Sequence, residues 1–223
     1  MGAEPIMLLG FLGGYPIGAK TVSSAYRSGA INREDANRML GFCNQAGPAF
    51  IFGIAGAIFE YSWIPIMIWG IIILSALITG FLLPGRSSLK CQYKKQTMNN
   101  PLESAIRAMA SVCGWVILFR VLLQILNRWL LWIFPTEMCA VIAGILELTN
   151  GCILLNGIQN KAIQFIALTG MLSFGGICVA MQTVSVIDKL DYKTYFAGKL
   201  LQTVIATVFA TLLSIILFPG NLF

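Results

Sequence analysis

Two uninterrupted apolar runs constrain this chain more than any other feature of its sequence. Ser62–Leu83 and Leu200–Phe218 contain no charged residue, and each approaches the roughly 20 residues that a helix needs to cross about 30 Å of hydrocarbon. The chain of 223 residues is 57% hydrophobic and only 11% charged, whereas a soluble domain averages about 25% charged residues. The sequence therefore predicts an all-α, polytopic membrane protein.

Four further apolar stretches contain residues that interrupt helices. They are Pro5–Ala19, broken at Gly-Gly-Tyr-Pro; Ala46–Phe59, which opens with Ala-Gly-Pro; Thr136–Asn156, broken at Glu147–Gly151; and Lys161–Val186, broken at Ser173–Gly176. A break in lipid would leave backbone N–H and C=O groups unpaired, so breaks persist only where protein or a wet cavity covers them. We expect all four breaks to face the interior of the protein.

The order of these parts repeats along the chain. Residues 1–83 contain a broken hairpin, a broken helix and a plain span, and residues 104–223 contain the same series behind a leading span, Ser104–Phe134. Residues 84–103 form a polar, basic linker between the two repeats. When the basic segments are placed on one side of a membrane, the two halves take opposite orientations. The sequence thus predicts an inverted repeat with re-entrant hairpins, as in many secondary transporters.

The net charge of +6 does not indicate nucleic-acid binding, because the charges are concentrated between the apolar segments. All but three of the 15 Lys and Arg residues fall in Lys20–Arg38, Arg86–Arg107 and Lys189–Lys199, which is the bias expected of cytoplasmic loops. We interpret these clusters as solvated faces beside anionic lipid. Ile31–Phe42 is predicted to be a surface helix with Asn32 as its N-cap.

Metal sites and catalytic groups are not expected. The chain has six cysteines without a Cys-x-x-Cys pair and no histidine, which argues against zinc sites and a disulfide framework. Gly13–Thr21 resembles a phosphate loop, but its Gly and Lys are out of register and no soluble strand precedes it. Because no nucleophile is paired with a base either, we expect neither an enzyme nor a cofactor.

The helix breaks supply most of the candidate binding residues. Freed N–H groups and half-helix N-termini attract anions, and side-chain amides add hydrogen-bond donors. The candidate solute-binding residues at or near the breaks are Gly13, Gly14, Tyr15, Pro16, Asn44, Gln45, Gly47, Thr149, Asn150, Ser173, Gly175, Gly176 and Gln182. The alternative is that the small residues only allow close helix packing. Their recurrence at matching positions in both halves favours a site.

Arg120 and Glu147 complete the candidate site, because each is an ionisable residue inside an apolar segment. Unpaired at the bilayer centre, either would cost about 2.5–3.5 kcal/mol or more. One hypothesis is that the two form a structural ion pair, or that Arg120 snorkels to the interface. The other is that Glu147 takes up a coupling proton or cation while Arg120 attracts an acidic substrate.

Four segments carry a resemblance to a known family. They are GFLGGYPIGAK, FCNQAGPAFIFG, LELTNGC and SFGGICVAMQ, in this order. They resemble the signature segments of the sporulation integral membrane protein YlbJ family, whose members carry the nucleoside recognition or Gate domain. The resemblance implies a small-solute permease distantly similar to concentrative nucleoside transporters. It further implies that dipicolinic acid, a flat ring with two carboxylates, is moved across the membranes around the forespore.

The chain departs from this family at its start. Family members begin with further membrane helices before the first motif, and the first half of this chain lacks a counterpart of Ser104–Phe134. We therefore expect a truncated or late-started product that lacks N-terminal helices.

The leading hypothesis is a multi-pass permease of the bacterial cell (inner) membrane that moves a small anionic or aromatic solute by alternating access. Dipicolinic acid is the first candidate, a proton or cation is the candidate coupling partner, and the oligomeric state is open. A nucleoside or nucleobase is the alternative solute. A non-transporting scaffold of the spore envelope is the alternative from another class, and it predicts a dry interior without a polar cavity at the breaks.

Overall fold

The structure is a computed structural model that describes residues 4–84, 101–187 and 189–219. Within these residues the regular structure is helical, and no strand is present. The helices are α1 (Glu4–Gly13), α2 (Ile17–Arg27), α3 (Arg33–Cys43), α4 (Pro48–Ile58), α5 (Trp63–Leu82), α6 (Pro101–Ile133), α7 (Thr136–Leu146), α8 (Leu148–Leu155), α9 (Lys161–Phe174), α10 (Gly176–Val186) and α11 (Tyr192–Leu217).

Among the described residues, four helical segments are long and apolar enough to cross a membrane. They are α5, the Ala105–Leu126 part of α6, the α9–α10 pair and α11. α5 and α11 cover all but the end residues of the two uninterrupted apolar runs, and α6 covers the predicted leading span up to Ile133. The prediction of an all-α polytopic membrane protein is therefore confirmed.

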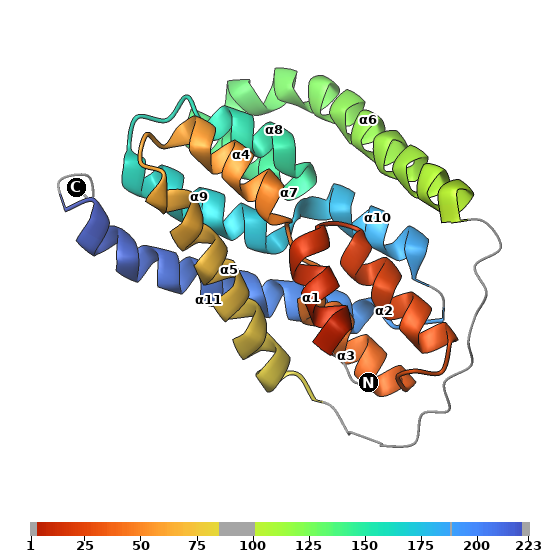
Figure 1. The fold of residues 1–223 in the computed structure, drawn as a ribbon. Coiled ribbons are helices and arrows are strands. Elements are labelled where there is room, and N and C mark those ends of the chain that lie inside the picture. Colours follow the sequence, from red (N-terminus) through yellow and green to blue (C-terminus); the bar gives the residue numbers. More distant parts are fainter. Residues whose placement is uncertain (1–3, 85–100, 188, 220–223) are drawn as a thin grey trace.

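The series of hairpin, interrupted helix and plain helix occurs twice. α1–α2, α3–α4 and α5 form the first series, and α7–α8, α9–α10 and α11 form the second, after α6. α9–α10 runs roughly opposite to α3–α4, and α11 runs roughly opposite to α5 (Figure 1). The α2–α3 and α10–α11 connections lie at one end of the molecule, and the α4–α5 and α8–α9 connections lie at the other. These directions are those of an inverted repeat. Most of the predicted linker, 84–103, lies outside the described residues.

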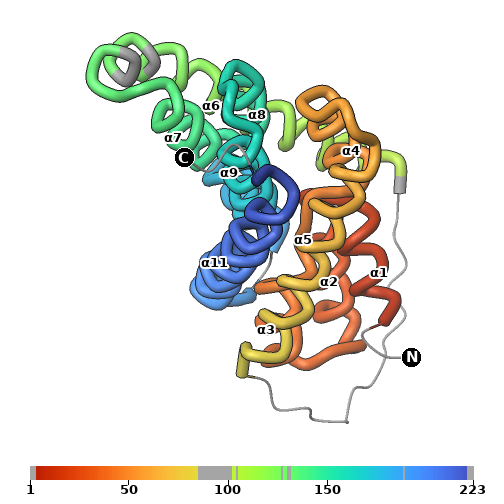
Figure 2. Tube along the Cα trace, turned by 90° about the vertical axis from the view of Figure 1, so that its left-hand side faces the viewer, coloured from red at the N-terminus to blue at the C-terminus, as the bar shows by residue number. Residues whose placement is uncertain are grey.

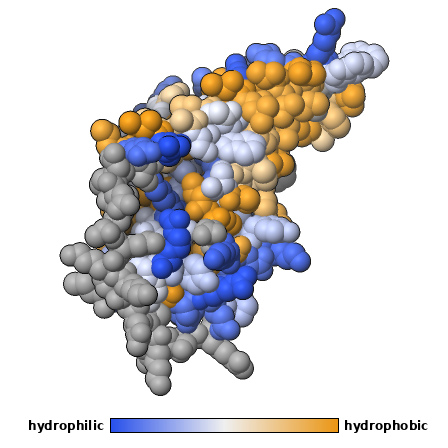
Figure 3. Space-filling view, turned by 90° about the vertical axis from the view of Figure 1, so that its right-hand side faces the viewer, coloured by the Kyte–Doolittle hydropathy of each residue, from blue (hydrophilic) through white to orange (hydrophobic). Residues whose placement is uncertain are grey.

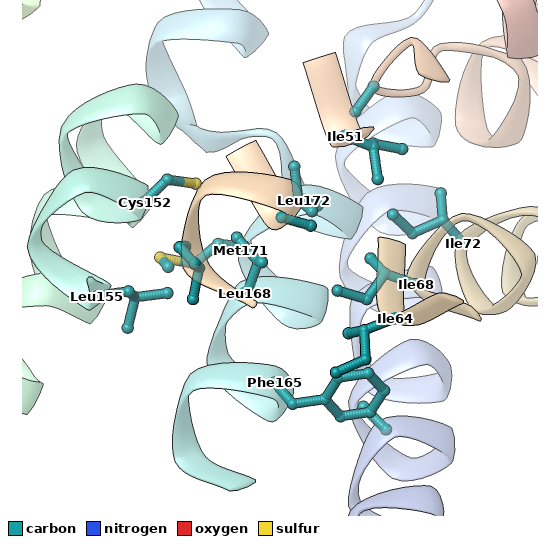
Figure 4. Close-up of a cluster of buried hydrophobic side chains, with 14 of the residues drawn as sticks. Ile51, Ile64, Ile68, Ile72, Cys152, Leu155, Phe165, Leu168, Met171 and Leu172 are labelled. Atoms are coloured by element: carbon teal, nitrogen blue, oxygen red, sulfur yellow. The ribbon is translucent and has the colours of Figure 1, made fainter. Parts of the chain in front are cut away.

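The main apolar core joins the two halves of the chain. Figure 4 shows Ile64, Ile68 and Ile72 of α5 on one side and Phe165 and Leu168 of α9 on the other, and all five are at most 1% exposed. The isoleucines are four residues apart, so they form one stripe along α5. Because lipid is as apolar as these side chains, close van der Waals packing holds this core rather than transfer out of water.

A glycine crossing brings α3 against α11. A Cβ on Gly198 would lie 2.6 Å from the Cα and the carbonyl oxygen of Gly41, so Gly198 has no room for a side chain. The predicted N-cap is confirmed, since Asn32 Oδ1 accepts from the Asp35 N–H at 2.7 Å. The prediction that Ile31–Phe42 is a surface helix is wrong, because α3 is buried along its C-terminal half and forms the first half of an interrupted helix.

The start of α11 also differs from the sequence prediction. Asp191 Oδ1 accepts from the Lys193 N–H at 2.9 Å, and this N-cap starts the helix at Tyr192. Lys189–Lys199 was predicted to be a solvated loop, which is wrong from Tyr192 onward. Lys199, at the end of this range, is only 1% exposed.

The outer surface is apolar over the long helices. Only 11% of the apolar window of α6 and 22% of that of α11 are buried within the structure. Hydrophobic residues cover most of the upper right lobe in Figure 3, and hydrophilic residues gather lower down. Figure 2, seen from the opposite side, places α6 and α7 in this lobe. An apolar exterior on helices of this length fits lipid rather than water.

Candidate functional site

The tip of the first hairpin packs directly on the first helix break. Gly14 joins α1 to α2 with φ of 76°, in the left-handed region that favours glycine. A Cβ on Gly14 would lie 3.1 Å from the backbone N of Gly47, and a Cβ on Gly47 would lie 3.2 Å from the Cα of Gly14. Two of the predicted site segments are thus in contact. Gly13 is exposed at the end of α1, and Pro16 follows Tyr15 through a cis peptide bond.

Tyr15 links this tip to the second interrupted helix. Its hydroxyl donates to the carbonyl oxygen of Leu172 at 2.9 Å. A Cβ on Gly175 would lie 2.8 Å from the same hydroxyl oxygen. Gly175 has φ of 85° and separates α9 from α10, so the interruption predicted within Ser173–Gly176 is confirmed.

Gly176 connects this break to the second hairpin. Its φ is 83°, and a Cβ there would lie 3.0 Å from the carbonyl oxygen of Gly144 and 3.3 Å from the backbone N of Leu148. Both hairpin tips and both interrupted helices therefore form one continuous set of contacts in the middle of the molecule.

The second hairpin breaks at a single residue, Glu147. Its carboxylate caps α8 by accepting from the N–H groups of Thr149 at 3.0 Å and Asn150 at 2.8 Å, and it also accepts from the Asn150 side-chain amide. The break predicted within Glu147–Gly151 is therefore at Glu147, the first residue of that range, whereas Thr149, Asn150 and Gly151 are helical. Gly151 instead allows close approach of α8 to α7, because a Cβ there would overlap the backbone of Gly144.

Asn44 fills the place where an anion was predicted to bind at the first tip. Its Oδ1 accepts from the Ala19 N–H in the first turn of α2 at 3.3 Å, and its Nδ2 donates to Thr183 Oγ1 of α10 at 2.8 Å. Asn44 is completely buried. The helix N-termini at α2 and α8 are thus satisfied by side-chain oxygens of the chain itself.

Two residues that sequence reasoning missed, Lys199 and Gln202 of α11, lie beside the candidate residues Gln45 and Ser173. Lys199 Nζ donates to Gln45 Oε1 at 3.1 Å and to the Ser173 carbonyl oxygen at 3.2 Å. Gln45 and Gln202 donate to each other at 2.8 Å in both directions. We call Tyr15, Asn44, Gln45, Ser173, Thr183, Lys199 and Gln202 the central polar cluster.

A periodic signal in the sequence could have indicated Lys199 and Gln202. The buried positions of α11 recur every three or four residues and are small or polar after the first one: Tyr195, Gly198, Lys199, Gln202, Ala206, Ala210 and Ser214. In an otherwise apolar helix, such a stripe is typical of a face that contacts other helices closely.

Arg120 and Gln182 lie outside the central polar cluster. Arg120 is exposed on α6 and, together with Asn150, lines a cleft of about 140 Å³ between α6, α7 and α8. The hypothesis of an Arg120–Glu147 ion pair is wrong, because the Glu147 carboxylate is bound to the N-terminus of α8 instead. Gln182 is buried and donates to Cys178 Sγ on its own helix at 3.4 Å.

These features define the class of the protein: an all-α, polytopic membrane protein whose two interrupted helices and two hairpin tips meet at a buried polar cluster. The comparison with known proteins agrees. The chain is 25% identical to the sporulation integral membrane protein YlbJ of Bacillus subtilis (strain 168), over an alignment of 256 positions that covers 93% of this chain. The resemblance indicated by the four motifs is thereby confirmed, with YlbJ as a homologue.

The chain spans 63% of the length of this relative. No protein-family model matches the chain. No solved structure matches it significantly.

Proposed function

We propose that this chain is a membrane permease for a small anionic or aromatic solute, with dipicolinic acid as the first candidate. The homologue is named for sporulation, so we place the proposed activity in the bacterial cell membrane and the membranes around the forespore. A proton or cation is the proposed coupling partner. The proposal assigns the chain no catalytic reaction.

One observation carries this proposal, namely the convergence of the interrupted helices of both halves on the central polar cluster. Asn44, Gln45, Lys199 and Gln202 are each at most 1% exposed, although the long helices around them have an apolar exterior. Polar and ionisable groups are expensive inside a membrane and usually mark a substrate or ion pathway. Broken helices that meet at the midplane are the usual construction of secondary-transporter sites.

A non-transporting scaffold of the spore envelope is the second candidate, and one observation favours it. The central polar cluster is closed, with Gln45, Gln202 and Asn44 hydrogen-bonded to other side chains rather than lining an open chamber. An alternating-access permease also needs such an occluded state between its two open states. Measured flux is therefore what separates the two functions.

The test is uptake of radiolabelled dipicolinate into liposomes that contain the purified chain. Asn44→Leu keeps the side-chain size and removes the amide, and we expect it to lower uptake about tenfold, as for the loss of a buried polar contact. Thr211→Val is the matched control, because Thr211 is exposed on α11 and bonds only within its own helix at 2.8 Å. Uptake by the unaltered chain no faster than by protein-free liposomes would eliminate the permease.

Competition then identifies the solute class. Unlabelled dipicolinate should reduce uptake of the label, whereas uridine in excess should leave uptake unchanged. If uridine competes as strongly as dipicolinate, the nucleoside alternative replaces the anionic solute.

A further inference from the structure

Lys199 is a buried cation that has no anionic hydrogen-bond partner among the described residues. Its Nζ donates to three neutral oxygens, Gln45 Oε1 at 3.1 Å, the Ser173 carbonyl at 3.2 Å and Gln202 Oε1 at 3.5 Å. The ring centroid of Tyr15 lies 5.2 Å from Nζ, within range of a cation–π contact. The groups that contact Nζ in the described part of the chain are therefore dipoles and a ring, and none of these carries a formal negative charge.

The position of Lys199 follows from the glycine crossing of α3 and α11. Gly198 lies against Gly41 with no room for a side chain. Gln45 follows the C-terminal end of α3, four residues after Gly41, and Lys199 directly follows Gly198. The crossing thus brings the Lys199 Nζ within 3.1 Å of Gln45 Oε1. Lys199 thus lies between the two interrupted helices, in contact with the end of each.

Gln45 and Gln202 form a closed amide pair in front of this cation. Each Nε2 donates to the other Oε1 at 2.8 Å, and both oxygens face the Lys199 ammonium. The pair presents two oxygens to the cation, as one carboxylate would. Gln45 comes from the first interrupted helix and Gln202 from the plain helix of the second half, so the pair closes the cluster across the two repeats.

Ser173 supplies an unused hydrogen-bonding group at the same place. Its hydroxyl is completely buried and has no hydrogen-bond partner among the residues that the structure describes, while its carbonyl oxygen accepts from Lys199. A buried hydroxyl without a partner costs free energy comparable to a lost hydrogen bond. The cluster therefore contains both a buried lysine whose hydrogen-bond partners are neutral and an unpaired hydroxyl.

We propose that Lys199 is the residue that recognises a carboxylate of the solute, and that the Gln45–Gln202 amide pair occupies the carboxylate position when no solute is bound. This inference rests on the proposed permease function. On binding, the carboxylate takes the place of the two amide oxygens at Nζ, and the freed Nε2 groups and the Ser173 hydroxyl donate to it. Charge-assisted hydrogen bonds of this kind are stronger than those between neutral groups. The buried Lys199, and not the exposed Arg120, is thus the residue that recognises the charge of the solute.

The test measures binding of two probes to the purified chain in detergent by calorimetry. The probes are dipicolinate and its neutral diamide, pyridine-2,6-dicarboxamide, which has nearly the same shape without the charge. We expect the unaltered chain to bind dipicolinate at least about tenfold more tightly than the diamide. Lys199→Met should abolish this preference, and Lys199→Arg should retain part of it.

Gln202→Glu is the sharper variant, because it builds a permanent carboxylate into the proposed position. It should fold at least as stably as the unaltered chain, since it gives Lys199 a counter-charge, and it should bind dipicolinate at least about tenfold more weakly. Gln159→Glu is the matched control, because Gln159 is exposed in the α8–α9 connection. It should bind both probes as the unaltered chain does.

The outcomes separate this inference from the proposed function. The chain could transport dipicolinate while Lys199→Met and Gln202→Glu prefer dipicolinate over the diamide as strongly as the unaltered chain does. In that case Lys199 only holds the helices together, and the inference is overturned. Equal binding of both probes by the unaltered chain would also overturn it, while leaving a permease for neutral solutes. Absence of both binding and flux would instead remove the permease itself.

Discussion

Gly175 is a position where both the backbone conformation and the packing require glycine. Its φ of 85° is in the left-handed region, and the space beside its Cα is taken by the Tyr15 hydroxyl. A side chain there costs about 1–2 kcal/mol for the backbone alone. We expect Gly175→Ala to lower the melting temperature measured in detergent by several degrees or more.

Gly114→Ala is the control for this change, because Gly114 lies within α6 and a Cβ there would meet no atom within 4 Å. Alanine is the better helix former by about 0.5–1 kcal/mol, so this variant should match or exceed the unaltered chain. Equal melting temperatures for Gly175→Ala and Gly114→Ala would contradict the structure at the second break.

Glu147 offers a test of a structural role against a coupling role. Because its carboxylate caps α8 at Thr149 and Asn150, Glu147→Ala should lower the free energy of unfolding by about 0.5–2 kcal/mol. Glu147→Gln keeps one side-chain oxygen and should lose less. Chemical denaturation of both variants measures this difference, and equal losses would argue against the cap. If Glu147 has a coupling role instead, dipicolinate uptake by the Glu147→Gln variant should no longer respond to a proton gradient.

The sequence predicted the polar residues of the breaks better than it predicted their partners. Asn44 and Gln45 follow directly from the Asn-Gln-Ala-Gly-Pro interruption, because such residues end helices. Lys199 was assigned to a solvated loop, because a lysine near other charged residues is usually exposed. Its burial depends on the contact between Gly41 and Gly198, which are far apart in sequence, so no local pattern determines it.

The crossing of α3 and α11 is the contact between elements on which the central polar cluster depends. Gly198→Leu would push α11 away from α3, at a cost of about 1–3 kcal/mol or more for overpacking. Gly70→Leu on α5 is the control, because a Cβ at Gly70 would meet no atom within 4 Å. We expect size-exclusion chromatography after heating to show aggregation of the first variant and recovery of the second. Equal recovery would mean that the close crossing is not required.

At the level of whole helices, the sequence predicted the spans and the sites of interruption well, but one assignment failed. α3 was interpreted as a surface helix because its first turn contains Arg33, Glu34 and Asp35. These three charges lie at its N-terminal end, where Asn32 caps it, and the buried run at its other end, Met39–Cys43, has no charge. In a short helix that starts at the surface and ends in the core, the charged first turn is the strongest sequence signal. That signal predicts a surface helix even though the other end is buried.

The whole molecule consists of two oppositely directed series of helices that meet at their interruptions. Ile64, Ile68 and Ile72 join the halves through apolar packing, while Gln45 and Gln202 join them through hydrogen bonds. The apolar contact has no polar group to expose, whereas the amide pair can exchange its partners for a solute. The proposed function requires the molecule to open at the amide pair while the apolar core stays fixed.

Access of a reagent to the central polar cluster is the most direct measure of whether the molecule opens there. The variant is Thr183→Cys, at the position that accepts from Asn44, in a chain whose six native cysteines are replaced by alanine or serine. A chain that retains only Cys152, which is 1% exposed in the apolar core, is the control. We predict that a small, membrane-impermeant thiol reagent modifies Cys at position 183 faster than Cys152 in liposomes, and that dipicolinate slows this reaction. Modification of both cysteines at the same slow rate, with or without dipicolinate, would contradict an opening chamber and favour a dry scaffold.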